Sequence, residues 1–140
     1  MWLKKILNRS QNEFNLQQKG YADVFSDASL FNNFISKGKK GKIAVNLIYW
    51  SSADQQLQAV DWTLIDSVQA SQDFATAINA STRGSSGFTA PGSAISFATP
   101  LFRSNDFDGE RQVIDVSGDG GQNSGINTAT ASDNALKSGI

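Results

Sequence analysis

A short apolar run that leads directly into a glycine-rich acidic turn, residues 112–123 (QVIDVSGDGGQN), constrains the fold more than any other feature. Val113, Ile114 and Val116 predict a buried strand, and the turn delivers the carboxylate of Asp119 at the carboxyl end of that strand. In open α/β sheets, ligands bind at this end of the strands. The stretch therefore predicts a sheet protein with a candidate ligand site.

The residue types that the chain lacks exclude several kinds of chemistry. There is no cysteine and no histidine among its 140 residues. Their absence rules out thiol catalysis, disulfides, zinc–thiolate sites and the usual general base at neutral pH. Any metal would have to be held by oxygen ligands. The length suits one domain with its own core.

The charge pattern argues against nucleic acid as a partner. The formal net charge is -1 and the two signs are interspersed, whereas nucleic-acid-binding domains carry a basic patch or stripe. We interpret the one basic cluster as a solvated turn. It consists of Lys37, Lys39, Lys40 and Lys42.

The amino-terminal residues do not match a targeting signal. In MWLKKILNRS, Asn8, Arg9 and Ser10 interrupt the apolar core of about seven or more residues that a secretion signal needs. No window approaches the roughly 20 apolar residues of a membrane span. We expect neither a signal peptide in this chain nor a transmembrane segment.

The first half of the chain predicts two helical pieces and two strands. The S-x-x-E motif at residues 10–13 is a capping box and predicts a helix over 14–25, and Asp27 can cap a second piece. Residues 42–50 (KIAVNLIYW) are almost continuously apolar, as in a strand covered on both faces. Residues 56–62 alternate loosely and predict an antiparallel partner near the sheet edge.

The second half predicts three helices, one loop and one strand. Residues 66–79 are helical in pattern, and residues 80–91 form a loop dense in glycine, serine and threonine. A further helix follows, which Pro100 should kink or end early. After the strand at 112–117, Thr128 can cap a last helix.

The order of these elements predicts an α/β fold, a mixed and mostly parallel sheet flanked by helices. Doubly wound sheets usually begin with a central strand, so we expect the first strand to be missing before Ser10. The chain stops at Ile140, directly after a helix. We interpret this as the start of an absent last strand.

Several segments resemble a bacterial family of unknown function with a von Willebrand factor A-like fold. The resemblance runs from about Ser10 to Ile140. It implies a Rossmann-like, von Willebrand A-type sheet lacking its first and last strands, with residues 1–9 as a non-family or truncated N-terminus and 10–140 as a partial domain. It also implies that full-length relatives are exported, to the periplasm or beyond. The segments are EFNLQQKGYADVF (13–25), GKIAVNLIYWS (41–51), DWTLI (61–65), SSGFTAPGSAI (85–95) and RQVIDVSGDGGQN (111–123).

The same resemblance implies a degraded metal-ion-dependent adhesion site. By position, Thr89 and Asp119 match two of the metal ligands of von Willebrand A domains. The Asp-x-Ser-x-Ser ligands of the first loop would fall at Lys4, Ile6 and Asn8, so all three are absent. Magnesium prefers six oxygens in near-octahedral geometry. We therefore expect Mg²⁺ to bind weakly or not at all.

Simpler interpretations stand beside these. Asp119 could be a turn aspartate bonded to its own loop, and Asp115 and Ser117 fit structural roles better than metal binding. A nucleotide site would require a glycine at position 123, where the chain has Asn123, and no G-x-x-x-x-G-K-[ST] sequence occurs. Trp50 and the other large aromatic residues fit core packing better than a stacking platform.

The function that we predict is a protein-binding module of the von Willebrand A type, with a protein partner and no nucleic acid or membrane span. Two alternatives stay open. One is a gene fragment without independent function. The other, less favoured, is a metal-dependent hydrolase that uses the Asp119 loop, against which the missing histidine and cysteine argue. The sequence does not indicate an oligomeric state.

Overall fold

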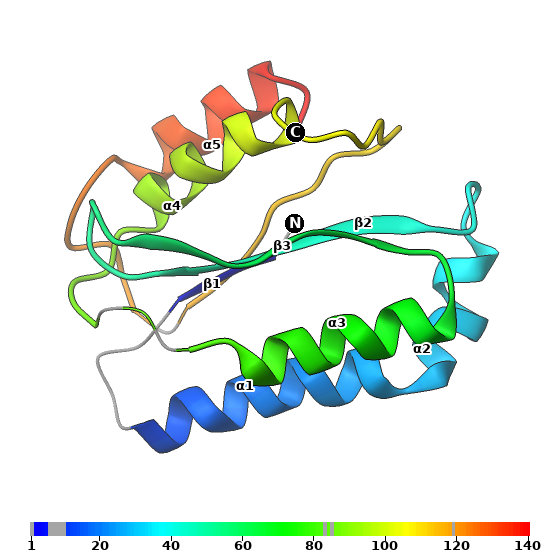
Figure 1. Ribbon diagram of the computed structural model, residues 1–140. Helices are drawn as coiled ribbons and strands as arrows, with labels where there is room; N and C mark the ends of the chain where they lie inside the picture. The colour runs from blue at the N-terminus through cyan, green and yellow to red at the C-terminus, as the bar shows by residue number, and fades with distance from the viewer. Residues whose placement is uncertain (1, 6–10, 83, 85, 119) are drawn as a thin grey trace.

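A sheet separates two helical layers (Figure 1) in a computed structural model that describes residues 2–5, 11–82, 84, 86–118 and 120–140. Helices α1, α2 and α3 cover one face, and α4 and α5 cover the other. Every helix in this part of the chain is too short or too polar to cross a lipid bilayer. The elements are β1 (Trp2–Lys5), α1 (Gln11–Ser26), α2 (Ala28–Asn33), η1 (Ile35–Lys37), β2 (Ile43–Trp50), β3 (Gln56–Ile65), α3 (Val68–Ala80), α4 (Pro91–Ala98), η2 (Thr99–Phe102), β4 (Asp115–Ser117) and α5 (Thr128–Lys137).

The sheet has the strand order β3-β2-β1-β4. Strands β2 and β3 are antiparallel, because residues 51–55 between them form a hairpin connection that is too short for a parallel crossover. Strand β1 is parallel to both of its neighbours. Trp2 lies opposite Leu47 of β2 on one side and Asp115 of β4 on the other.

The predicted Rossmann-like, mostly parallel sheet of the von Willebrand A type is wrong. The two long strands form the antiparallel β2–β3 hairpin, and the strands that run parallel to β2 have only four and three residues. The first strand, which we expected to be missing, is present as β1. Residues 112–114, expected to belong to the strand at 112–117, lie outside β4. Apolar patterning finds strands but does not determine how they pair, and this explains the error.

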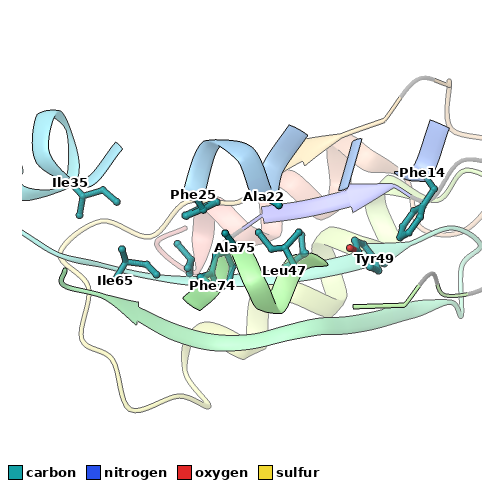
Figure 2. Packing of buried hydrophobic residues seen from close by; sticks show 11 residues of the cluster. Phe14, Ala22, Phe25, Ile35, Leu47, Tyr49, Ile65, Phe74 and Ala75 are labelled. Atoms are coloured by element: carbon teal, nitrogen blue, oxygen red, sulfur yellow. The ribbon is translucent and has the colours of Figure 1, made fainter. Parts of the chain in front are cut away.

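The larger of two buried clusters lies between the sheet and the helices α1 and α3. Figure 2 shows aromatic side chains from three elements in contact there. The rings of Phe14 and Tyr49 pack edge to face with their centroids 5.2 Å apart, and those of Phe25 and Phe74 do so at 4.8 Å. Such pairs add about 0.5–1.5 kcal/mol to the stabilisation from buried area. The cluster consists of Phe14, Ala22, Phe25, Ile35, Val45, Leu47, Tyr49, Ile65, Phe74, Ala75 and Ile78.

The second cluster lies on the opposite face, under α4 and α5. It uses the alternate residues of β2, Ile48 and Trp50, because successive side chains of a strand point to opposite faces. Trp62 packs against it, with its ring 5.4 Å from that of Phe102. Strand β2 is therefore covered on both faces, as its sequence predicts.

Several local predictions are confirmed. Asp27 caps α2 by accepting a hydrogen bond from the backbone of Ser29 at 2.8 Å. Helix α4 ends at Ala98, and the chain continues through Pro100 in the tighter turn η2. The prediction that Thr128 caps the last helix is wrong by one residue, because Asn127 caps α5. Ser10 of the predicted capping box lies outside the described residues.

We predict that Phe74→Ala lowers the free energy of unfolding by about 3–5 kcal/mol, the usual cost of emptying an aromatic site in a core. Phe74 is 2% exposed and packs on Phe25. The matched control is Phe88→Ala, at a phenylalanine that is 65% exposed, for which we expect a change within about 0.5 kcal/mol. Urea unfolding followed by far-ultraviolet circular dichroism measures both. Equal losses in the two variants would contradict the core described above.

We predict that the stability contribution of Tyr49 is lost in alkaline solution. Burial raises the pKa of its phenol, and the hydrogen bond with Ser81 at 2.8 Å opposes this shift only partly. Because the pKa is higher in the folded state, the contribution is complete below the unfolded pKa of about 10 and disappears as the pH rises through the folded pKa. The unfolding free energy of the wild type minus that of Tyr49→Phe, measured by urea titration across this range, should fall. A flat difference would contradict the prediction.

Candidate functional site

Three connecting segments meet at one end of the sheet, where β2 ends (Figure 1). We call this region the loop edge and define it as residues 51–55, 86–90 and 120–127. The first segment is the β2–β3 hairpin turn, the second leads into α4, and the third leads from β4 into α5. Hydrogen bonds join the second segment to each of the other two.

Ser51 anchors the first two segments to each other. It is fully buried, and its hydroxyl donates to the side-chain oxygen of Gln55 at 2.7 Å. Its carbonyl accepts a hydrogen bond from the backbone of Ala90 at 3.0 Å. The start of α4 is thereby fixed directly to the end of β2.

Phe88 projects from the second segment while its backbone is held in place. Its N–H donates to the hydroxyl of Ser52 at 2.9 Å, yet 65% of the residue is exposed. The neighbouring Gly87 packs so closely that a Cβ there would collide with the Ser52 hydroxyl. A large apolar ring is therefore presented to solvent on a loop that has little freedom to move.

Thr89 links the second and third segments. Its backbone N–H donates to the side-chain oxygen of Asn123 at 2.7 Å. Its carbonyl accepts from the backbone of Asn123 at 3.0 Å and of Ser124 at 3.2 Å. The two loops are therefore joined through both the N–H and the carbonyl of Thr89.

Two glycines let the third segment approach α4 closely. Gly125 has a φ of +74°, a region that disfavours other residues. A Cβ on Gly92 would collide with the carbonyl of Ile126. This close approach allows the backbone of Ile126 to donate to the hydroxyl of Ser93 at 3.1 Å.

Gln122 organises the turn that precedes α5. Its amide nitrogen donates to the carbonyl of Ile126 at 2.7 Å, and its oxygen accepts from the backbone and the hydroxyl of Thr128 at 2.9 and 2.8 Å. The third segment is thus ordered by its own side chains as well as by Thr89. Hydrogen bonds therefore hold all three segments of the loop edge together.

Only part of the predicted metal site can be placed. Thr89 lies in the loop edge and is 7% exposed, whereas Asp119 lies outside the described residues. Lys4 lies within β1, opposite Tyr49 and Ser117, and Ile6 and Asn8 lie outside the described part of the chain. Across the described residues, no three histidine, cysteine, aspartate or glutamate side chains gather where they could hold a metal.

The other polar residues considered from the sequence, Asp115 and Ser117, lie in β4. Asp115 is exposed, and the hydroxyl of Ser117 lies 3.2 Å from that of Tyr21 on α1.

Sequence reasoning missed Phe88 and Ser52. Nothing in the sequence marks Phe88 as exposed, because its apolar character equally suits a core.

The comparisons with known proteins bear on the family alone. No curated protein and no solved structure matches the chain. A family model matches residues 8–140, nearly the whole chain. The chain therefore belongs to the family described as "Protein of unknown function (DUF1194)".

Proposed function

We propose that this chain is a protein-binding module and that the loop edge is its binding surface. The observation that carries the proposal is Phe88, a 65% exposed phenylalanine on a loop whose backbone is fixed by Ser52. Large aromatic side chains contribute a disproportionate share of the binding energy at protein interfaces. Ile126, on the third segment of the loop edge, is a second large apolar residue that is exposed, at 46%.

The hydrogen bonds of the loop edge favour binding over catalysis. A loop that is already ordered loses little conformational freedom when a partner binds, so more of the contact energy appears as affinity. The bonds around Thr89 and Gln122 supply this order. No described residue of the loop edge is a histidine or cysteine, and the described carboxylate Asp54 is exposed. We therefore propose a function without catalysis.

The proposal keeps the loops of the von Willebrand A resemblance but not its metal chemistry. Thr89 stands where that resemblance implies a metal ligand, and its backbone ties two loops together. A site with one hydroxyl and one carboxylate offers too little charge and too few ligands for magnesium. We propose that binding to the partner needs no divalent cation.

We predict that the Phe88→Ala variant no longer captures the partner. Immobilised protein should capture the same partner from a lysate of the source cells in the wild type and in Leu16→Ala, and lose at least about 90% of it in Phe88→Ala. Leu16 is a matched control because it is 70% exposed on α1. Quantitative mass spectrometry measures capture, and thermal unfolding checks that each variant is folded. Equal capture by both variants would show that the loop edge is not the binding surface.

We predict that chelation leaves this capture unchanged. Adding EDTA to the same experiment should not reduce the partner recovered, because one hydroxyl and one carboxylate are too few ligands to hold magnesium. Titration calorimetry with magnesium chloride provides an independent measurement and should show no saturable binding. A dissociation constant in the low micromolar range, or loss of the partner in EDTA, would refute the metal-free part of the proposal.

A further inference from the structure

Strand β3 forms one edge of the sheet. It has 10 residues and, among the described strands, pairs only with β2. Strand β1 lies on the far side of β2, and β4 forms the opposite edge of the sheet. The backbone groups on the outer side of an edge strand are a template for pairing with another chain. The chemistry of β3 therefore decides whether this edge accepts a further strand.

The sequence of β3 suits pairing at every position except Asp61. The segment QLQAVDWTLI contains no proline, glycine or lysine, and Asp61 is its only charged residue. Uncharged segments of about six or seven residues with high β-propensity and no proline pair readily with copies of themselves. Natural edge strands oppose such pairing with charged side chains, proline or bulges. In β3 the charge of this kind is that of Asp61 alone.

Asp61 lies near the middle of β3, where the pairing with β2 is irregular. The register shifts there, so that Asp61 and Trp62 together lie opposite the single residue Asn46. Such a bulge bends the strand and increases its twist, which makes an edge a poorer template. The side chain of Asp61 is exposed, so its charge is presented to any chain that approaches.

Side chains of β3 also bond both polar groups of one peptide unit in the bulge. The carboxylate of Asp61 accepts a hydrogen bond from the N–H of Trp62 at 2.6 Å, and the hydroxyl of Thr63 donates to the carbonyl of Asp61 at 2.9 Å. This N–H and this carbonyl belong to one trans peptide unit, so they point in opposite directions. Whichever of the two faces away from β2 is therefore already bonded.

The charge of Asp61 opposes pairing with a second copy in particular. Two β3 strands that pair antiparallel about a two-fold axis overlap most when the axis passes through Val60 or Asp61. In the second register the two Asp61 side chains lie directly opposite each other. In the first they are diagonal neighbours on the same face of the sheet. Like charges in such positions destabilise a strand pair.

We propose that Asp61 protects the free edge of β3 and prevents two copies of the chain from joining their sheets there. The protection has two parts, which are the hydrogen bonds within the bulge and the negative charge at the middle of the strand. Without them, β3 is an antiparallel dimerisation surface. The proposal concerns a different part of the molecule from the loop edge and is independent of the function proposed there.

The test compares the self-association of the full chain with that of Asp61→Val by sedimentation velocity at matched concentrations. Valine suits a strand but supplies neither the charge nor the acceptor. We expect Asp61→Val to self-associate at least about tenfold more tightly than the wild type. Unchanged self-association in the folded variant would overturn the proposal.

The matched control is Asp73→Val. Asp73 is an exposed carboxylate on α3 that accepts a hydrogen bond from the side chain of Gln69 at 2.9 Å, much as Asp61 accepts one from Gln58. The control should self-associate no more than the wild type. An equal increase in both variants would show a general effect of added apolar surface and would refute a specific role of Asp61.

A second substitution locates the association on β3. Leu57→Lys adds a cation to this strand at a residue that is 43% exposed, and charge on an edge strand opposes pairing. The double variant with Asp61→Val and Leu57→Lys should therefore return to the self-association of the wild type. Association that persists in the double variant would occur through another surface and would contradict the proposal.

Asp61→Asn keeps the test decisive where valine destabilises the fold. Asparagine retains an oxygen that can accept the N–H of Trp62, but it carries no charge. Thermal unfolding should show a fold as stable as the wild type to within about 1 kcal/mol, the conversion of a fivefold change in the unfolding constant. We expect self-association at least about threefold tighter than in the wild type. No increase in this variant would overturn the role of the charge.

Discussion

The burial of β2 on both faces is the constraint on which the rest of the structure depends. From Val45 to Trp50 every residue is buried, and alternate side chains supply both clusters of the core. The removal of this much apolar surface from water dominates the stability. The cost is a buried amide at Asn46, which is fully inaccessible and whose side-chain atoms have no hydrogen-bond partner among the described residues. An unsatisfied polar group of this kind costs about 1–3 kcal/mol.

The sequence predicted what local chemistry determines. The run at 42–50 is β2 because continuous apolar residues suit a strand covered twice, and Asp27 caps α2 because a carboxylate satisfies free N–H groups at a helix start. It did not predict what depends on distant contacts. The central position of β1 rests on its register with Leu47 and Asp115, which lie 45 residues or more away. The four residues of β1 include two lysines and show no apolar pattern that predicts a strand.

The sequence predicted which two loops meet at the candidate site, but not the hydrogen bonds that join them. The turn after β4 and the glycine-rich loop do meet at one edge, as strand-to-turn patterns predict. The hydrogen bonds there are made by amides and hydroxyls, such as Asn123 to Thr89 and Ser51 to Gln55. Such side chains are common in loops everywhere, so their pattern does not reveal which ones meet. The exposure of Phe88 is likewise a tertiary property, since its backbone is bonded to Ser52, which lies 36 residues away in the chain.

The two ends of the sheet differ in a way that follows from how its strands overlap. At the loop edge, β1 reaches Lys5 opposite Trp50, so β1 and β2 end together. At the other end, β2 begins four residues before its register with β1, and no described strand covers that difference. A closed end orders its loops and presents a fixed surface. This order is the reason that we propose the loop edge as a binding surface.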